Sequence, residues 1–260
     1  MPEPLSDNAL GEPFVELDSI DSTNNYALGK IHAGMASHGL TFFAWEQYAG
    51  RGQRGRIWQS EKGNNLIISI ILNPAPLLPL QQFQLSTCFS VSVASWFARL
   101  AGEATRIKWP NDLYWHDRKA GGMLIESVIS RHDSDSPHWK WAVAGVGINI
   151  NQVHFEPGIK NPVSLRQITG KSYRVNELAR ELCREFEKNW QLLKQGSFPG
   201  LLEQYNQLLF RKNEEVKLRQ GNRVFTATLL RVDEQGKLWV REGIEKDYSF
   251  GEIEFLLHNR

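Results

Sequence analysis

A short glycine- and arginine-rich segment, residues 50–56, has the residue types and spacing needed to bind an anion. Glycine lets the backbone adopt positive φ and change conformation at low steric cost. Arginine carries a planar fork of donors that suits carboxylates and phosphates. The glycines and arginines are Gly50, Arg51, Gly52, Arg54, Gly55 and Arg56. The segment predicts a loop that closes over an anion, although a solvent-exposed basic turn accounts for the same residues about equally well.

The glycine spacing also fits two nucleotide-binding loops, and the flanking sequence argues against both. A dinucleotide fingerprint needs a helix that begins at the loop and an acidic residue about 20 positions later. Residues 56–65 are poor helix formers, and that distance falls on Leu72, Asn73 and Pro74. A kinase glycine loop needs His-Arg-Asp and Asp-Phe-Gly elements, and neither tripeptide occurs. A full Walker-type Gly-x-x-x-x-Gly-Lys-Ser/Thr sequence is also missing from the chain, because Leu165 precedes the single Gly-Lys-Ser at residues 170–172 where the motif needs a glycine.

Four further polar clusters fall at expected strand ends or turns, where binding and catalytic residues usually lie. Each also has a simpler explanation, because hydroxyl and Asx residues cap helices, Asx residues follow proline in turns, and lysine is usually exposed. Gly121 and Gly122 make Lys119 less ordinary, because a bare backbone allows a ligand to approach closely. The clusters are Ser22 with Thr23, Gln47 with Arg51, Asn111 and Asp112 with Lys119, and Asn149.

Apolar runs and amphipathic stretches predict the elements that must position these clusters. Residues 66–72 form a continuous β-branched run and predict a strand buried on both faces. Strands are also expected at residues 14–17, 41–45, 123–129 and 139–150, with a strand, turn and strand at 106–115. Helices are expected at residues 25–32, 80–101, 174–194 and 198–209, a tight turn at 117–122 and a polar hairpin loop at 131–138. The pattern predicts an α+β fold with a mixed central β-sheet and packed helices.

The chain changes character after residue 211, where short strand patterns alternate with glycine-containing turns. These patterns occupy residues 215–219, 224–232, 238–240 and 253–257. We expect a small β-barrel of about 50 residues that packs on the main domain, because so small a unit is marginally stable alone. The predicted organisation is a polar lead-in at residues 1–12, a main domain at 13–210 and a C-terminal domain at 211–260.

Composition narrows the functional classes. Hydrophobic residues make up 41% of the 260-residue chain and charged residues 23%, as in ordinary globular proteins. The net charge of +1 argues against a protein that coats nucleic acid. Membrane spans and signal peptides are not expected, since the apolar runs fall short of roughly 18 residues and the first residues lack a basic and apolar start. Cys88 and Cys183 fall in expected helices and indicate buried thiols in a reducing, cytoplasmic compartment.

Metal-ligand spacing is not found among the seven scattered histidines or the two cysteines. A Gly-x-Ser-x-Gly elbow of serine hydrolases is also absent from the sequence. We therefore expect no metal held by protein ligands, and Mg²⁺ only as an ion carried by phosphates.

Five short motifs follow one another along the chain, at residues 21–24, 50–56, 108–112, 119–122 and 145–149. They read Asp-Ser-Thr-Asn, Gly-Arg-Gly-Gln-Arg-Gly-Arg, Lys-Trp-Pro-Asn-Asp, Lys-Ala-Gly-Gly and Gly-Val-Gly-Ile-Asn. This order resembles that of the biotin protein ligases over residues 14–257, and Gly251, Glu252 and Ile253 resemble that family's closing motif. Five ordered motifs are far more specific than one glycine loop.

The resemblance implies a class II synthetase-like catalytic domain followed by an SH3-like β-barrel. It also implies a two-step reaction, in which biotin and ATP give biotinyl-5'-AMP and the biotinyl group then passes to a lysine of a biotin carboxyl carrier protein. Lys119 and Arg51 would be the main catalytic residues, and Asp112 would orient or deprotonate the incoming lysine. Biotin would contact Ser22, Thr23, Asn24, Gln47, Arg51, Gly52, Gln53, Lys119, Gly122 and Gly145. ATP or the adenylate would contact Arg51, Arg54, Arg56, Trp58, Asn111, Lys119 and Asn149.

Departures from the family pattern occur at three positions. Gln53 stands where relatives often have arginine, and Ala120 and Gly121 replace a bulky apolar residue and alanine. These departures are expected to loosen retention of the intermediate without changing the reaction. About a dozen residues precede the first strand, too few for a helix-turn-helix, so the resemblance implies the monofunctional form with no DNA-binding or repressor role.

Two other functions fit part of the same pattern. A lipoate-protein ligase would share the fold and the adenylate chemistry, and a non-catalytic sensor would bind biotin without transferring it. The glycine-rich loop and the Lys-Trp-Pro-Asn-Asp motif favour biotin. A carrier from acetyl-CoA carboxylase or a related carboxylase is the expected protein partner. A homodimer could form if the strand at residues 139–150 were a sheet edge.

Overall fold

A seven-stranded mixed sheet forms the centre of the protein in this computed structural model, which describes residues 8–130, 138–156 and 161–257. Its strand order is β1-β2-β5-β9-β8-β7-β6. The pairing of β1 with β2 is parallel and the other pairings are antiparallel. The strands are β1 Phe14–Leu17, β2 Thr41–Ala44, β5 Asn65–Leu72, β6 Thr105–Lys108, β7 Asp112–Trp115, β8 Arg118–Ser130 and β9 His138–Asn149. The predicted fold class is confirmed.

Strand β5 separates two apolar clusters, which explains its β-branched sequence. All eight of its residues are buried. Ile68 and Ile70 belong to the larger cluster, whereas Ile71 belongs to a smaller cluster that includes Ala27 and Ile31 of α1. Successive side chains of a strand point to opposite faces, so Ser69 shares the face of Ile71. A hydroxyl is thereby placed among apolar residues, on the face where the site lies.

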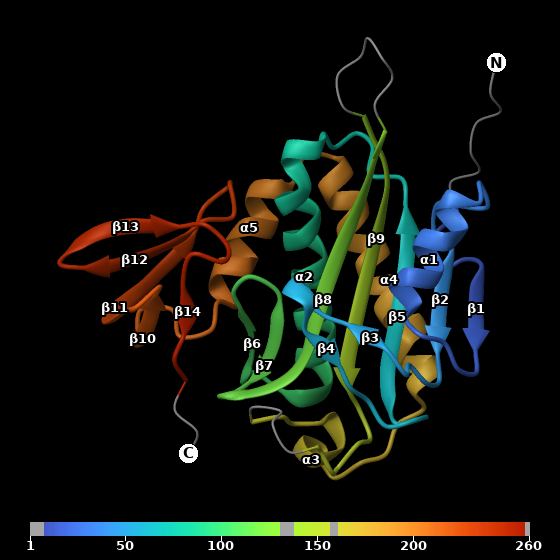
Figure 1. Cartoon of the computed structure of the whole chain (residues 1–260), viewed down its shortest axis with the longest axis horizontal. Helices are drawn as coiled ribbons and strands as arrows, with labels where there is room; N and C mark the ends of the chain where they lie inside the picture. Colours follow the sequence, from blue (N-terminus) through green and yellow to red (C-terminus); the bar gives the residue numbers. More distant parts are fainter. Residues whose placement is uncertain (1–7, 131–137, 157–160, 258–260) are drawn as a thin grey trace.

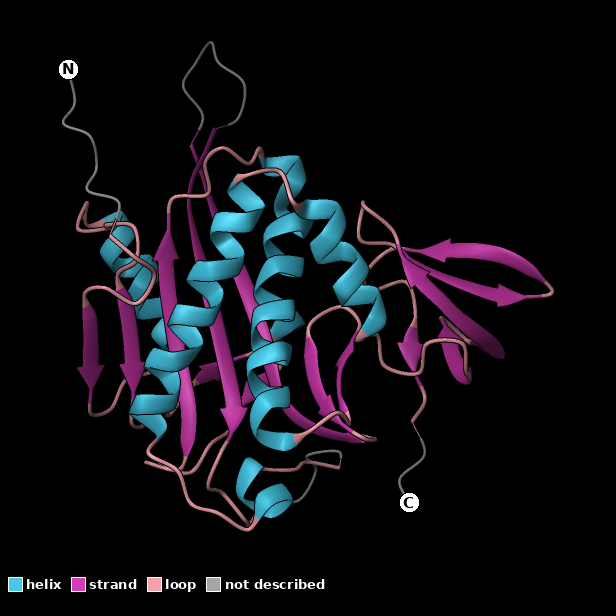
Figure 2. Ribbon diagram, turned by 180° about the vertical axis from the view of Figure 1, so that it is seen from behind, coloured by secondary structure: helices cyan, strands magenta, loops and turns pink. Residues whose placement is uncertain are grey.

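Helices cover the two faces of the sheet unequally. Three helices lie on one face, as Figure 2 shows: α2 Gln82–Ala101, α4 Val175–Lys194 and α5 Phe198–Gln207. Helix α1 (Thr23–His32) and the short pair β3 (Gly50–Arg51) and β4 (Ile57–Trp58) lie on the other (Figure 1). The prediction missed this strand pair and the short helix α3 (Leu165–Thr169), which Ser164 caps through its side chain. Short 3-10 turns at Gln53–Gly55 and Pro79–Gln81 complete the helical segments.

The C-terminal segment folds as a five-stranded antiparallel sheet with strand order β13-β12-β11-β10-β14. Within the described residues no ladder joins β13 to β14, so the ladders describe an open sheet. One of its strands, β13, was not predicted. The strands are β10 Glu215–Gln220, β11 Arg223–Val232, β12 Leu238–Glu242, β13 Ile244–Tyr248 and β14 Glu254–Phe255.

Specific hydrogen bonds fix this second sheet beside the β6–β7 end of the first (Figure 1). The indole N–H of Trp109 donates to the Gly236 carbonyl at 3.0 Å. Asn206 of α5 bonds the backbone of Val232 twice, at 2.9 and 2.7 Å. These bonds join backbone groups of the small sheet to side chains of the β6–β7 turn and of α5, and so hold the small sheet against the main domain.

Three expectations about local structure need correction. Strand β8 already begins at Arg118, so residues 119–122 lie in a strand and not in a tight turn. Strand β9 lies between β5 and β8, so it is an interior strand and not the sheet edge that was considered for a dimer. Residues 142–148 are already paired on both sides, and residues 138–141 pair with β8 alone among the described strands. The expected hairpin loop at 131–138 lies outside the described residues except for His138, where β9 begins.

Both cysteines are buried on their helices, as predicted. Burial raises the pKa of Cys88 above its usual range and raises that of Cys183 to about 12. Among the helices in the described part of the chain, none has the length and hydropathy required to cross a lipid bilayer.

Candidate active site

A cavity of about 1870 Å³ is lined by residues from the start of α1, the β3–β4 pair and the C-terminal sheet. Its walls come from segments far apart in the sequence. Every residue that the sequence marked as a site residue lines it: Ser22, Thr23, Asn24, Gln47, Arg51, Gly52, Gln53, Arg54, Arg56, Trp58, Asn111, Asp112, Lys119, Gly122, Gly145 and Asn149. The motifs therefore converge on a common space, although each is unremarkable alone.

The start of helix α1 forms one polar end of the cavity. Ser22 is the N-cap residue by conformation, yet its side chain makes no capping hydrogen bond. Gln47 provides the cap instead, because its Oε1 accepts from the Thr23 backbone N–H at 2.7 Å and from the Thr23 hydroxyl at 3.1 Å. A long side chain from a neighbouring loop thus satisfies an orphan helix N–H. The Ser22 hydroxyl is left without a capping role at the cavity wall.

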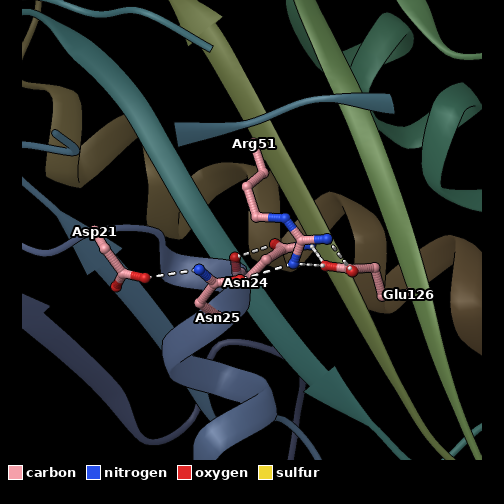
Figure 3. A network of polar contacts seen from close by, with 6 residues as sticks. Asp21, Asn24, Asn25, Arg51 and Glu126 are labelled. Atoms are coloured by element: carbon pink, nitrogen blue, oxygen red, sulfur yellow. Dashed lines mark hydrogen bonds and ion pairs between the residues drawn. The ribbon is translucent and has the colours of Figure 1, made fainter. Parts of the chain in front are cut away.

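A buried hydrogen-bond chain runs from β5 through α1 to β8 (Figure 3). The Ser69 hydroxyl lies 2.5 Å from Asn24 Oδ1 and 2.7 Å from Thr23 Oγ1. The Asn24 amide N–H donates to Glu126 Oε2 at 2.8 Å. Because a carboxylate only accepts, Glu126 fixes the orientation of the Asn24 amide, which turns its oxygen toward Ser69.

Glu126 also holds the arginine of the glycine-rich segment, as Figure 3 shows. The Arg51 guanidinium lies 3.0 Å from Glu126 Oε1 through Nη2 and 3.4 Å from Oε2 through Nη1. Nη1 also donates to Asn25 Oδ1 at 2.7 Å, and Asn25 is in turn bonded to Asp21 at 2.6 Å. Arg51 is therefore anchored to both α1 and β8 while 43% of its side chain stays exposed.

The glycine-rich segment itself is an ordered hairpin. Strand β3 pairs with β4 through Gly50 with Trp58, and Gly52 N–H donates to the Arg56 carbonyl at 2.7 Å. Arg54, with φ of 56°, and Gly55, with φ of 74°, form its left-handed tip. The predicted use of positive φ by glycine is seen at Gly55, whereas Gly52 is extended and Arg54 adopts positive φ without being glycine.

The tip of this hairpin contacts the C-terminal sheet segment. The Arg54 guanidinium reaches the Gly251 carbonyl at 3.5 Å and stacks over the Phe250 ring at 5.5 Å. A Cβ at Gly251 would lie 2.7 Å from Arg54 Nη2, and φ of 95° at this position also favours glycine. The resemblance to the closing motif therefore has a physical basis in the contact between the hairpin and the second sheet.

Lys119 and Asp112 form an ion pair across β7 and β8. The Lys119 Nζ lies 2.6 Å from Asp112 Oδ1, and both side chains are mostly buried. Gly122 sits beside the pair, because a Cβ there would lie 3.3 Å from Asp112 Oδ1 and 3.6 Å from Lys119 Nζ. The glycine leaves open the space in front of the amine. A mostly buried ammonium with one carboxylate partner keeps further N–H donors for an anion.

Asn111 and Asn149 bond backbone groups of the cavity wall. The Asn111 amide donates to the Met123 carbonyl. The Asn149 amide donates to the Val163 carbonyl at 3.1 Å and approaches the Lys119 carbonyl at 3.5 Å. Both side chains therefore fix backbone groups close to Lys119, and both residues line the cavity.

Trp58 lies flat against the bare backbone of β9. A Cβ at Gly147 would lie 2.5 Å from the Trp58 ring, and the buried indole N–H has no hydrogen-bond partner among the described residues. On the same strand, a Cβ at Gly145 would lie 2.0 Å from Asn24 Oδ1. The glycines at 145 and 147 are thus required by side chains that pack on them.

Sequence reasoning missed four residues of this site. Ser69 and Glu126 had a usable signal, since each is a polar residue within an apolar strand sequence. Gly147 was part of a recognised motif, but its contact with Trp58 could not be foreseen. Lys108 lines the cavity from the end of β6 and received no role.

Within the described residues no group of three or more His, Cys, Asp or Glu side chains could hold a metal ion. The cavity instead contains cations on several walls. An anionic ligand is the kind that such walls favour.

The fold matches that of ligases of known structure. The biotin protein ligase from Aquifex aeolicus in complex with biotin and ATP superimposes with a TM-score of 0.76 at 26% identity, covering 94% of this chain and 98% of that chain. A point mutant of the Aquifex aeolicus ligase in complex with biotin gives a TM-score of 0.75 at 27% identity, covering 93% of this chain and 97% of that chain.

Sequence comparison gives relatives of the same class as the structural comparison. The Biotin/lipoate A/B protein ligase family model matches residues 16–136. The bifunctional ligase/repressor BirA of Escherichia coli (strain K12) is 34% identical over 248 residues, which are 94% of this chain and 74% of that protein. The biotin--[acetyl-CoA-carboxylase] ligase of Paracoccus denitrificans is 30% identical over 228 residues, 85% of this chain and 91% of that protein. The chain belongs to the biotin protein ligase family.

Proposed function

We propose that this chain is an ATP-dependent biotin protein ligase. It activates biotin as biotinyl-5'-AMP and transfers the biotinyl group to a specific lysine of a biotin carboxyl carrier protein. The observation that supports this most strongly is the convergence of the five motifs on a single cavity, in which Lys119 and Arg51 are held by carboxylates at defined positions.

The first step joins two anions, and the fixed cations suit that task. A biotin carboxylate oxygen attacks the α-phosphorus of ATP, and pyrophosphate leaves. Lys119 and Arg51 would lower the repulsion between the carboxylate and the phosphate and stabilise the charge that builds up in the transition state. Their carboxylate partners hold both cations in place before the substrates bind, so little reorganisation is needed at the moment of reaction.

The polar end of the cavity at α1 would receive biotin. Ser22 and Thr23 offer hydroxyls, and Asn24 and Gln47 offer amides whose orientations are fixed by the hydrogen bonds already described. Gly52 and Gln53 of the hairpin would close over the ligand, and Gly122 and Gly145 would leave room for it. Trp58, Asn111, Asn149, Arg54 and Arg56 would face ATP or the adenylate, with Mg²⁺ carried by the phosphates.

The second step needs a base near the acyl carbon, and Asp112 is our proposal for it. The carrier lysine amine attacks the acyl carbon, the acyl–oxygen bond to AMP breaks, and AMP leaves with the electron pair. Asp112 uses one oxygen for Lys119 and has a second oxygen to accept the proton lost by the incoming amine. The hairpin would shield the mixed anhydride from water until the carrier arrives.

We further propose a catalytic domain at residues 13–210 after a lead-in at 1–12, and a C-terminal domain at 211–260. The proposed partner is the carrier of acetyl-CoA carboxylase or a related carboxylase in the cytoplasm, without a nucleic-acid role.

A homodimer, if it forms, is proposed to pair through strand β8 and not through β9. The ladder with β7 covers β8 only as far as Gly122, which leaves residues 124–130 without a partner strand on that side within the described chain.

Exchange of labelled pyrophosphate into ATP tests the proposed reaction. We expect exchange that depends on biotin and does not respond to lipoate. Exchange with lipoate alone would identify a lipoate ligase and overturn the proposal. Biotin binding in the absence of any exchange would indicate a sensor.

A further inference from the structure

Lys108 is a cavity residue with no assigned role and an unusual environment. It ends strand β6 and pairs in register with Asp112 of β7. Its Nζ lies over two aromatic rings, 4.7 Å from the centroid of Phe255 in β14 and 5.7 Å from that of Tyr114 in β7. Among the described residues, no carboxylate forms an ion pair with it. The ammonium is therefore held between the two sheets by ring faces.

The carboxylates near Lys108 already form ion pairs with other cations. Asp112 is 2.6 Å from Lys119, and Glu254 is 3.7 Å from Arg219, so both nearby carboxylates already have cations. Burial lowers the pKa of the Lys108 amine, and the positive charges of Lys119 and Arg56 lower it further against the opposing effect of Asp112 and Glu254. Lys108 is thus a partly buried lysine whose nearest carboxylates pair with other cations.

We propose that Lys108 binds the polyphosphate of the nucleotide and stabilises the pyrophosphate that leaves from it. This inference rests on the proposed function and assigns a specific group to its leaving anion. Cation–π contacts hold an ammonium without neutralising its charge, so the N–H donors of Lys108 stay available for phosphate oxygens. A multiply charged anion suits the position, because Lys119 and Arg56 contribute to the same local field.

The proposed role of Lys108 follows from the bonds that form and break in the first step. A carboxylate oxygen of biotin forms a bond to the α-phosphorus, and the bond between that phosphorus and the bridging oxygen breaks. The bridging oxygen departs with the electron pair as part of pyrophosphate. A cation near the leaving group stabilises the charge that develops there and so lowers the barrier. Since Lys108 also touches Phe255, this stabilisation would require the C-terminal sheet to be in place.

Three substitutions test the proposal in the intact chain: Lys108→Gln, Lys108→Arg and, as a control, Lys62→Gln. The control removes an exposed lysine that pairs with Asp18 and Glu46 outside the cavity. Lys108→Gln should raise the KM for ATP about 10-fold to 100-fold in biotin-dependent pyrophosphate exchange, the range expected for one or two lost charge-assisted bonds. The KM for biotin should change less than about twofold, as expected for a loss confined to the polyphosphate site.

A charge-conserving substitution and the pH dependence of ATP binding separate a binding role of Lys108 from a structural one. Lys108→Arg should restore the KM for ATP to within about fivefold of the wild type, because the cation is kept. Since only the protonated amine binds phosphate well, the wild-type affinity for ATP should fall as pH rises through the lowered pKa of Lys108 in the free protein. That fall should begin below the normal titration range of lysine and should be absent from Lys108→Gln.

The outcomes are distinguishable. If wild-type protein shows no biotin-dependent exchange, the proposed function fails. If wild-type exchange is normal and Lys108→Gln keeps its KM for ATP and its pH profile, only the assignment of Lys108 is wrong. If Lys108→Gln instead raises the KM for an apo carrier domain and leaves that for ATP unchanged, the cation faces an acidic side chain of the carrier, and the proposal is overturned. Thermal unfolding of each variant checks that the fold is intact.

Discussion

Replacing Gly145 by alanine should disrupt the hydrogen-bond chain that orients the biotin end of the cavity. The new Cβ would lie 2.0 Å from Asn24 Oδ1 and 2.8 Å from its Cγ. A normal contact between such atoms is about 3.5 Å or longer. The Asn24 side chain would therefore have to move by more than an ångström, away from Ser69 and Glu126.

The size of the expected loss of stability follows from the hydrogen bonds that Asn24 makes. Asn24 is 4% exposed and makes bonds of 2.5 Å to Ser69 and 2.8 Å to Glu126. Each buried polar group left without a partner costs about 1–3 kcal/mol, so we expect a loss of about 2–5 kcal/mol in the free energy of unfolding. Because Glu126 also anchors Arg51, the KM for biotin should rise as well, by about 10-fold or more if one charge-assisted bond is lost.

Urea unfolding and biotin-dependent pyrophosphate exchange measure the two effects. Gly29→Ala is the matched control, because it adds the same methyl group to α1, where nothing lies within 4 Å. Alanine is a better helix former than glycine, so this control should be neutral or stabilising by up to about 1 kcal/mol. Unfolding and biotin KM for Gly145→Ala that match those of Gly29→Ala would refute the role assigned to Asn24.

Three shorter predictions test other parts of the site. Lys119→Ala should unfold cooperatively yet lose pyrophosphate exchange by about 100-fold or more, and near-normal exchange would remove Lys119 from the mechanism. Glu126→Gln should speed tryptic cleavage within the glycine-rich hairpin about twofold to fivefold, because a half-exposed ion pair stabilises the hairpin by up to about 1 kcal/mol. Glu185→Gln, which breaks the comparable 3.0 Å pair with Arg99, should leave that cleavage unchanged. Cys88 and Cys183 should resist a thiol reagent until urea exposes them, because burial raises both pKa values; rapid native labelling would contradict their burial.

Elements with strong local patterns were predictable from the sequence. The β-branched run of β5 and the amphipathic spacing of α2 and α4 specify buried faces directly, and their observed bounds lie within two residues of those expected. Strand β13 was missed because its sequence, with Glu245, Lys246 and Asp247, is charged, and its pairing with β12 overrides that local preference.

Sheet order and side-chain partners depended on non-local contacts. The placement of β9 inside the sheet follows from pairing with both β5 and β8, which no single segment encodes. Gly121 suggested a turn, yet it lies inside β8. Glycine is needed there because a Cβ would lie 2.7 Å from the Gly147 carbonyl oxygen. Arg51 was recognised as a cation, but its partner Glu126 lies 75 residues away, so only the fold could reveal the pair.

Transfer of biotin to a carrier lysine is the measurement that tests the central claim most directly. The intact chain would be incubated with ATP, biotin and an apo biotin carboxyl carrier domain, and the product detected by streptavidin and intact-mass analysis. We predict the addition of one biotinyl group to the target lysine, and none when that lysine is replaced by arginine or when ATP is omitted. A folded, biotin-binding chain that leaves the carrier unmodified under these conditions would contradict the account.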